Sequence, residues 1–466
     1  MSAPVSAFTP SVLADIVVRK RADVAARRRA RPPAELERVV EPATRRFGAA
    51  LARPGRRFVL ECKRRSPSEG ALRADFDAAA LAAGYDGAAD AISVLTDGPF
   101  FGGSFADLRA VRARTALPVL CKDFVLEPYQ VLEARAHGAD AVLLMLSLLD
   151  DAGWRACAAA AAALGMDALT EVHDEAELER ALRLEAPIVG INNRDLRTLA
   201  VDLGTTARLA PRIPRDRVIV CESGIRTRAD VDAVADHVDA FLVGTTLVRA
   251  ARPDLAAREL AYGVVKVCGL TTPADACAAY AAGASLGGVI LAAESPRRVD
   301  AAAAAALAAG APLPLVGVFV DEALGRIAEL AARLELRAVQ LHGEETPAFV
   351  AALRTRLPAG CEIWKAVRVR DRIPTPGETG ADRVLLDGYR ADARGGSGIA
   401  FDWSLLAGYP QRERVVLAGG LTPENARAAQ ALGCGALDVC SGVEAAPGVK
   451  DAATLARFFD ALRGAA

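Results

Sequence analysis

The sequence predicts an α/β fold of two (β/α)8 TIM barrels in tandem, and three observations point to it. The chain has 466 residues, too many for one ordinary domain of roughly 100–250 residues. Short runs rich in Val, Ile and Leu alternate with alanine-rich stretches of helical length. Strands that are buried on both faces and joined by helical crossovers have this pattern. Eight such runs occur in each half of the chain, the number that closes a barrel.

The runs can be followed along the sequence. The first half opens with RFVLECK and AISVLT and closes with RVIVCESG and AFLVGTT. The second half opens with VVKVCGL and LGGVIL and closes with RVVLAGG and ALDVCSG. Two open doubly wound sheets are the alternative, but no GxGxxG fingerprint follows a first strand, so we favour barrels. Residues 251–262 read as the last helix of the first barrel, which predicts domains of residues 1–262 and 263–466.

An additional helical segment, SVLADIVVRKRADVAARRRA, precedes the first strand of the first barrel. Pro32 and Pro33 stop it. Its basic run, Arg27–Arg31, is either a solvated helix face, which we favour, or a lid over an anionic site.

Composition argues against several classes of protein. A net charge of −1 does not suggest a nucleic-acid or anionic-membrane surface. No apolar stretch approaches the ~20 residues that span a bilayer, and the start lacks the layout of a signal peptide. The nine cysteines form no CxxC pair, and the four histidines are not at ligand spacing. We therefore expect a cytoplasmic protein with reduced thiols, no metal and no cofactor.

Polar residues stand at the carboxyl ends of the predicted strands in the first half. In a strand, residues i and i+2 share a face, which puts Phe124 beside Lys122 and Arg194 beside Asn192. One such residue alone is more often a surface charge in a loop. Six on the catalytic face of one barrel indicate a site. The six are Glu61, Lys63, Lys122, Glu171, Asn192 and Glu222.

The second half repeats this arrangement with different residue types. Lys266 and Cys268 share a face of the first strand, Asp387 ends RVLLD, and His342 ends VQLH. A lone cysteine is usually a small buried hydrophobe and a lone histidine usually structural, but a thiol that faces a carboxylate across a barrel is a plausible base. The motif SPRR follows the second strand and offers a cation, and GGSG, residues 395–398, comes after Asp387.

Glycine turns follow the seventh and eighth predicted strands of both halves. They are ESGI and VGTT in the first half, and AGGL and CSGVE in the second. The loops after these two strands are the usual phosphate site of the barrel fold, where backbone N–H groups hold the anion.

Long motifs around these residues resemble two known families. ECKRRSPSEG, LCKDF, LTEVHDEAELERAL, GINNRDLRTLAVDL and ESGI resemble indole-3-glycerol-phosphate synthase. KVCGLT, SPRRV, VQLHG, GGSG, LAGGLTPEN and SGVE resemble phosphoribosylanthranilate isomerase. Apart from its extreme termini, the whole chain resembles the bifunctional bacterial enzyme of tryptophan biosynthesis.

The resemblance implies two consecutive reactions. The second half would isomerise N-(5-phosphoribosyl)anthranilate to 1-(o-carboxyphenylamino)-1-deoxyribulose 5-phosphate by an Amadori rearrangement. The first half would close that product into indole-3-glycerol phosphate, with loss of carbon dioxide and water.

For the synthase, the resemblance implies that Lys122 is the general acid and Glu171 the base. Lys63 would hold the substrate carboxylate and take part in proton transfer, with Glu61 orienting it. Asn192 would belong to the same catalytic set. Further substrate-binding positions are Ser66, Phe124, Arg194, Glu222 and Ser223, and phosphate-binding positions are Gly224, Gly244 and Thr245.

For the isomerase, the resemblance implies that Cys268 is the general base and Asp387 the general acid. Arg297 would contact the anthranilate carboxylate, and His342 would bind substrate. The phosphate turns would use Gly419, Gly420, Ser441 and Gly442. The chain departs from the family where Thr245 and Cys440 replace common serines, and where LAAESPRR lacks the usual aromatic residue.

Two other functions are less consistent with the sequence. Sugar-phosphate isomerases such as those of histidine biosynthesis place aspartates at the ends of strands one and five; this chain has Lys63 and Glu171, or Cys268 and Lys365. A catalytically silent sensor would not need the acids and bases that both halves contain. The partners expected are small phosphorylated substrates, with no nucleic acid and no membrane, and the chain is expected to be a monomer.

Overall fold

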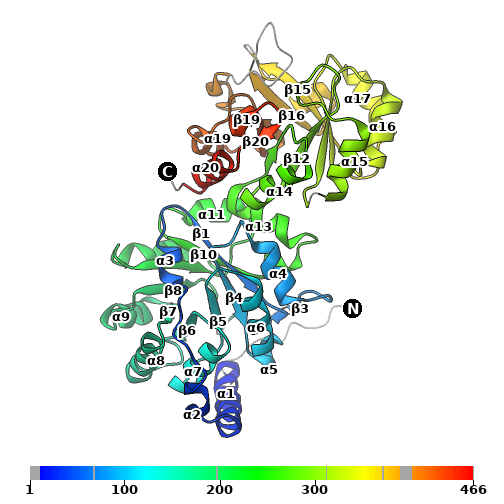
Figure 1. The fold of residues 1–466 in the computed structure, drawn as a ribbon. Helices are drawn as coiled ribbons and strands as arrows, with labels where there is room; N and C mark the ends of the chain where they lie inside the picture. The colour runs from blue at the N-terminus through cyan, green and yellow to red at the C-terminus, as the bar shows by residue number, and fades with distance from the viewer. Residues whose placement is uncertain are drawn as a thin grey trace, which may run out of the picture. The chain divides into compact units, whose positions relative to one another are not determined.

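The computed structural model describes residues 11–66, 69–195, 198–310, 312–369, 372–388 and 401–464. The chain divides into two compact units, Met1–Leu260 and Ala261–Ala466. Within the described residues, each unit holds one closed barrel of eight parallel strands (Figure 1), which confirms the predicted fold class. The turn GGSG lies outside the described residues.

The first barrel closes because β1 pairs with strands on both of its sides. Leu60 of β1 is in register with Ile92 of β4 and with Val243 of β10. Almost every residue of these strands is buried, as the continuous apolar runs predict. The strands are β1 (Arg57–Cys62), β4 (Ala91–Leu95), β5 (Val119–Lys122), β6 (Ala141–Met145), β7 (Asp167–Val172), β8 (Ile188–Asn192), β9 (Val218–Glu222) and β10 (Ala240–Val243).

Helices surround this ring, and polar caps fix where several of them begin. Asp77, Ser104, Asp174 and Thr227 each accept a backbone N–H of the first helical turn. A small hairpin, β2 (Arg65–Ser66) and β3 (Gly70–Ala71), follows β1. The helices are α3 (Phe47–Leu51), α4 (Ala78–Tyr85), α5 (Gly98–Phe101), α6 (Phe105–Arg114), α7 (Pro128–Ala136), α8 (Asp151–Ala163), α9 (Glu175–Arg183), α10 (Gly204–Leu209), η1 (Ala210–Arg212), α11 (Arg228–Val234), α12 (Thr245–Arg249) and α13 (Pro253–Tyr262).

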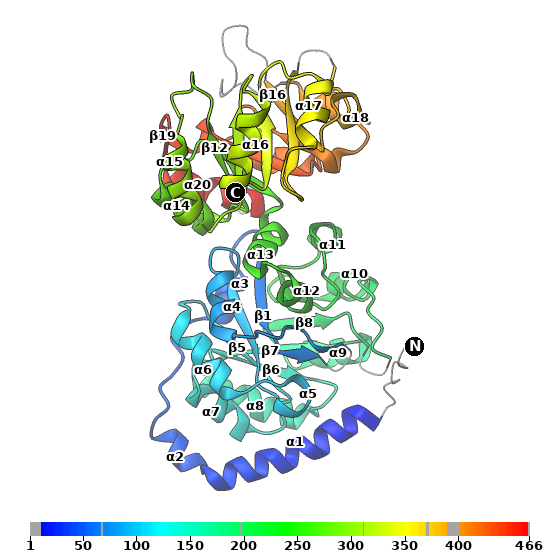
Figure 2. The same cartoon turned by 90° about the vertical axis from the view of Figure 1, so that its right-hand side faces the viewer.

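The predicted N-terminal helix is present as α1 (Ser11–Ala30), and α2 (Pro33–Glu37) follows it. Figure 2 shows α1 crossing one end of the first barrel. The Lys20 ammonium of α1 is buried between two carboxylates, 2.5 Å from Asp97 Oδ1 and 2.6 Å from Asp123 Oδ1. In the basic run, Arg27 bonds Glu133 of α7 at 2.9 Å. This part of the run therefore packs against the barrel.

The second barrel is built in the same way. Its strands are β11 (Val265–Val267), β12 (Leu286–Ile290), β13 (Leu315–Phe319), β14 (Ala338–Leu341), β15 (Glu362–Val369), β16 (Arg383–Gly388), β17 (Val415–Leu417) and β18 (Ala436–Val439). β11 pairs with β12 on one side and with β18 on the other. The remaining elements are α14 (Pro273–Ala282), α15 (Ala301–Gly310), α16 (Leu324–Arg333), α17 (Pro347–Arg354), α18 (Pro376–Thr379), η2 (Trp403–Leu406), η3 (Arg412–Arg414), α19 (Ala426–Ala431), η4 (Ser441–Val443), β19 (Glu444–Ala446), β20 (Val449–Lys450) and α20 (Ala452–Arg463).

The interior of each barrel is a packed apolar core, which places any site at a mouth. Val59, Leu120 and Leu169 belong to the first core, and Val316, Trp364 and Leu385 to the second. No helix in the described part of the chain is both long and apolar enough to cross a membrane.

Candidate active sites

The first barrel has a cavity of about 470 Å³ at the carboxyl ends of its strands. Strand ends that are far apart in the sequence meet there because the ring is closed. Every residue predicted for the first-half site lines this cavity. They are Glu61, Lys63, Ser66, Lys122, Phe124, Glu171, Asn192, Arg194, Glu222, Ser223, Gly224, Gly244 and Thr245.

Lys122 lies between two buried carboxylates in this cavity. Its Nζ is 2.6 Å from Glu222 Oε2 and 3.4 Å from Glu171 Oε2. Burial alone would lower the pKa of Lys122, but the two glutamates outweigh it and raise the pKa well above its usual value. Lys122 therefore stays protonated unless a bound ligand changes the charges around it.

The two glutamates that share Lys122 differ in their proton affinity. Burial raises the pKa of Glu222 to about 7; Lys122 opposes this and the neighbouring Glu171 carboxylate adds to it. Burial also acts on Glu171, but Lys122 and His173 together lower its pKa below the usual range. Although Lys122 is closer to Glu222, Glu171 has a second cation, so Glu171 is the carboxylate that stays ionised.

His173 is a part of this site that sequence reasoning missed. It follows β7, with Nε2 3.2 Å from Glu171 Oε1 and Nδ1 3.0 Å from Glu177 Oε2. Burial would lower the pKa of His173, but the two carboxylates raise it to about 10, so the ring is an imidazolium at neutral pH. The sequence signal was the spacing Glu171, His173, Glu177, which puts one histidine within reach of two carboxylates.

Other predicted contacts complete the first site. Lys63 Nζ is 2.8 Å from Glu61 Oε1, so the two side chains meet as their shared strand face predicted. Cations that the sequence analysis did not select, Arg226 and Arg249, line the cavity beside the predicted phosphate turns. Ile16 of α1 also lines it. The N-terminal helix therefore contributes an apolar wall.

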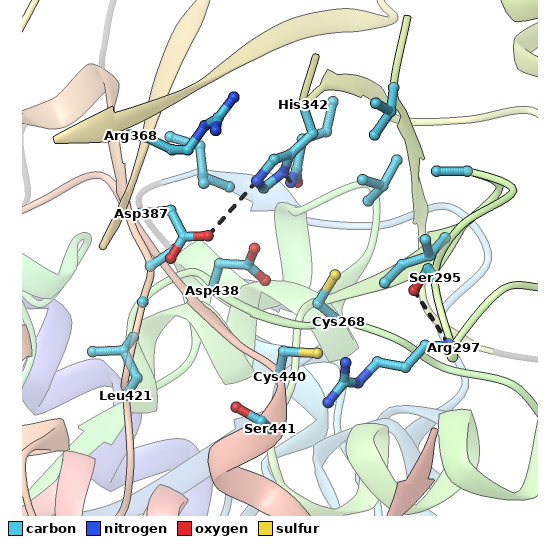
Figure 3. Close-up of a pocket in the computed structure, with 18 of the residues that line it drawn as sticks. Cys268, Ser295, Arg297, His342, Arg368, Asp387, Leu421, Asp438, Cys440 and Ser441 are labelled. Carbon is cyan, nitrogen blue, oxygen red and sulfur yellow. Dashed lines mark hydrogen bonds and ion pairs between the residues drawn. The ribbon is translucent and has the colours of Figure 1, made fainter. Parts of the chain in front are cut away.

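The second barrel has a cavity of about 650 Å³ at the corresponding end (Figure 3). Every residue predicted for the second-half site lines it. They are Cys268, Arg297, His342, Asp387, Gly419, Gly420, Ser441 and Gly442.

The Cys268 thiol is buried at the edge of this cavity. The neighbouring Cys440 thiol lowers the pKa of Cys268 far below that of an ordinary thiol. Burial opposes this effect, and the Lys266 ammonium adds to it. These partners favour the thiolate, the form of cysteine that can accept a proton.

Asp387 and His342 lie across the cavity from Cys268, as Figure 3 shows. His342 Nε2 is 3.6 Å from Asp387 Oδ2. Asp438, which sequence reasoning missed, lines the cavity between Asp387 and Cys268. The Arg297 guanidinium bonds both oxygens of Glu444, at 2.8 Å and 3.0 Å.

The glycine turns of the second site touch each other. A Cβ placed on Gly442 would overlap the carbonyl oxygen of Leu421, so only glycine allows the loop after β18 to approach the loop after β17 this closely. Gly419 and Gly420 both have positive φ, at 78° and 66°. The turns form one wall of the cavity, as a phosphate site after strands seven and eight requires.

Comparison with known proteins matches each half of the chain to a different enzyme family. The family model for indole-3-glycerol phosphate synthase matches residues 13–260, and that for N-(5'phosphoribosyl)anthranilate (PRA) isomerase matches residues 265–461. The tryptophan biosynthesis protein TrpCF of Vibrio cholerae serotype O1 is 47% identical over 452 residues, 97% of this chain and 96% of the relative. That of Yersinia pestis is 46% identical over 457 residues, 98% of this chain and 95% of the relative.

A solved structure, phosphoribosyl anthranilate isomerase from Thermus thermophilus, is 40% identical to this chain. It covers 42% of this chain and 96% of its own length, with a TM-score of 0.37. Each family model covers one of the two barrels, and the relatives match the chain over both. The chain therefore belongs to the bifunctional family of tryptophan biosynthesis, with an indole-3-glycerol phosphate synthase barrel followed by a phosphoribosylanthranilate isomerase barrel.

Proposed function

We propose that the two activities use the strand-end residues in separate roles, with the isomerase acting first. The substrate of the isomerase would be N-(5-phosphoribosyl)anthranilate, and its product would be the substrate of the synthase. Both are phosphorylated, and glycine turns after strands seven and eight line each cavity. Residues Gly224, Gly244 and Thr245 would hold the phosphate in the synthase, and Gly419, Gly420, Ser441 and Gly442 would hold it in the isomerase.

In the synthase, Lys122 is the general acid that polarises the substrate carbonyl during ring closure. The observation that carries this role is the burial of its ammonium between Glu171 and Glu222. A charged donor held in a site that excludes water stabilises the oxyanion that forms during attack by the ring. Glu171, kept ionised by His173, accepts the proton when water is lost.

The remaining synthase residues bind the substrate. Lys63, oriented by Glu61, pairs with the substrate carboxylate until carbon dioxide leaves. Asn192 belongs to the catalytic set and lies near Glu171, whose pKa it helps to lower. Contacts to the rest of the substrate come from Ser66, Phe124, Arg194, Glu222 and Ser223, all of which line the cavity.

In the isomerase, Asp387 protonates the ribose ring oxygen and opens the ring. Cys268, as the thiolate, then removes the proton on C2 of the resulting iminium, and the enol becomes the ketone product. Arg297 and His342 line the same cavity and bind the anthranilate end. The observation that carries these roles is the placement of the Cys268 sulfur and the Asp387 carboxyl group across one cavity.

Two further expectations complete the proposal. We place the functional boundary between Tyr262 and Gly263, within the short segment that separates the two family matches. We also expect a monomer, because the described residues that line each cavity all come from one unit of the chain. Light scattering of the purified chain would test the second expectation.

A turnover assay tests the proposal as a whole. Phosphoribosylanthranilate supplied to the purified chain should lose its fluorescence, and indole fluorescence should follow as the second product forms. The carboxyphenylamino intermediate supplied alone should give the indole signal without the first phase. Binding of either compound without turnover would show a sensor, and the proposed roles would then be wrong.

A further inference from the structure

The isomerase barrel contains a buried cation that the proposed mechanism does not use. Lys266 lies in the middle of β11 and is completely inaccessible to solvent. Its Nζ lies 2.8 Å from Asp438 Oδ2 and donates a 2.9 Å hydrogen bond to Gln340 Oε1. Taking an ammonium group out of water is costly unless it is paired, so this placement needs an explanation.

Lys266 and the Cys268 thiol lie against the same glycine of the neighbouring strand. A Cβ placed on Gly288 would lie 2.7 Å from Lys266 Cε and 2.8 Å from Cys268 Sγ. Both side chains therefore occupy the space that glycine leaves open on the neighbouring strand. The charge of the Lys266 ammonium also acts on the Cys268 sulfur and lowers the pKa of the thiol.

Gln340 extends this contact to the other side of the cavity. Lysine can only donate, so the amide oxygen of Gln340 must face Lys266 and the amide NH2 group must face His342. Gln340 Nε2 is 3.1 Å from His342 Nδ1, which therefore accepts the hydrogen bond. The proton of a neutral His342 is then on Nε2, the nitrogen that faces Asp387 at 3.6 Å.

We propose that Lys266 and Gln340 are positioning residues of the isomerase, which hold Cys268 as a thiolate and His342 in the Nε2–H tautomer beside Asp387. The proposal rests on the roles proposed above for Cys268 and Asp387. Gln340 is the centre of the arrangement, because its oxygen fixes the lysine and its nitrogen fixes the histidine. A single amide thus orients groups beside both the base and the acid.

Other charged groups face Cys268 and must be considered in any pH measurement. Lys450 of β20 and the Cys440 thiol after β18 favour the thiolate. The charge of Arg297 also interacts with Cys268. Asp438 opposes the thiolate but is paired with Lys266. Lys266 is the cation that lies with the sulfur against Gly288, which singles it out for mutation.

The test measures the reactivity of Cys268 without requiring turnover. The rate of alkylation of Cys268 by iodoacetamide is followed against pH by peptide mass spectrometry in the full-length chain. In the wild type, the midpoint should lie well below the value of about 8.5 for a free thiol. A midpoint at or above that value overturns the proposal, whatever the isomerase activity.

Two variants test separately the effect of Lys266 on the thiol and the effect of Gln340 on the acid and the base. The double variant Lys266→Met/Asp438→Asn removes the ammonium without leaving its carboxylate partner charged. It should raise the midpoint and slow alkylation at pH 7 by about tenfold or more, because less of the thiol is ionised. Gln340→Met keeps a similar volume. It should lower isomerase kcat by about tenfold, with a shifted pH profile and an unchanged KM, because the acid and the base both lose their alignment.

The control is Lys365→Met, which removes another partly buried lysine of the same barrel. Lys365 bonds Glu345 and two backbone carbonyls and does not line the cavity. Its alkylation midpoint should match the wild type. If the double variant does not fold, Gln340→Met and the wild-type midpoint still decide. A folded Gln340→Met chain with wild-type kcat and an unchanged profile overturns the proposal; an active Cys268→Ser chain would instead overturn the proposed base.

Discussion

The two active sites use lysine at different depths in the same fold, and this difference separates their chemistry. Lys122 is the last residue of β5, and its ammonium faces the cavity between two carboxylates. Lys266 lies in the middle of β11, two residues before Cys268 and on the same face of the strand. Lys122 lines its cavity, whereas Lys266 is completely buried and shares its strand face with Cys268, which lines the other cavity. In the roles proposed above, the lysine at the strand end donates a proton and the deeper lysine supports a base.

The carboxylates that pair with these two lysines also differ between the sites. Glu171 and Glu222 flank Lys122 in the synthase, and their pKa values are shifted in opposite directions. In the isomerase, burial raises the pKa of Asp438 to about 7, while Lys266 opposes that shift. Asp438 thus balances a buried lysine, whereas Asp387 faces the proposed position of the substrate.

Lys122→Ala should give the largest effect, because it removes the proposed general acid and the cation that Glu171 and Glu222 share. Synthase kcat should fall by ~10²–10⁴ or more, the usual loss for a general acid. Isomerase activity of the same chain should stay near the wild-type value, since the described residues that line the isomerase cavity all belong to the second half. Separate assays of the two reactions check this. A loss below about threefold would be too small for a missing general acid and would refute the role.

Asp387→Asn should produce the reverse pattern with a similar or smaller loss. The amide keeps the size of the side chain but cannot donate a carboxylic proton to the ribose oxygen. Isomerase kcat should fall by ~10²–10⁴, and synthase activity with the carboxyphenylamino substrate should be unchanged. Equal losses of both activities, together with a lower melting temperature, would show a folding defect instead.

Gly442→Ala should weaken binding of the phosphate in the isomerase. The added methyl group would overlap the Leu421 carbonyl, so the two turns must separate. Losing one hydrogen bond to a charged group should raise KM roughly 10–100-fold, with a smaller change in kcat. Gly325→Ala is the matched control, because a Cβ at residue 325 has no neighbour within 4 Å. An unchanged KM in Gly442→Ala would separate these turns from phosphate binding.

His173→Gln should give the smallest effect, visible in the pH dependence of stability. The pKa of His173 rises from an unfolded value of about 6.5 to about 10 in the fold. The stabilisation is therefore complete below pH 6.5 and is lost as the pH rises toward 10. The melting temperature of the wild type should exceed that of the variant by a few degrees at pH 6.5, at about 2–4 °C per kcal/mol. The two should converge near pH 10, and a constant difference across this range would exclude the charge as its cause.

Most of the two sites could be predicted because their residues interrupt apolar strands at the ends. Glu61, Lys122 and Asp387 are charges in runs that are otherwise Val, Ile, Leu and Cys, so the closed ring brings them to the cavities. The place of His173 in the site was not predicted, because it depends on Glu177, which lies on the following helix. The depth of Lys266 inside the barrel was not predicted either, because the strand pattern shows which face a residue is on but not how far it lies from the mouth. The pairing of Arg297 with Glu444 joins segments whose distance only the folded barrel sets.

The burial of Lys20 was also not predicted, and it has a consequence for synthesis of the chain. Its partner Asp123 comes 103 residues later, so α1 leaves the ribosome long before its docking site exists. At about 5–20 residues per second, the helix waits roughly 5–20 s before the aspartate has been added. We therefore expect the first segment of the nascent chain to be among the last to acquire protection. Ribosome-bound chains stopped after residue 110 should leave the amide hydrogens of α1 exchanging freely, and those stopped after the first barrel has emerged should protect them.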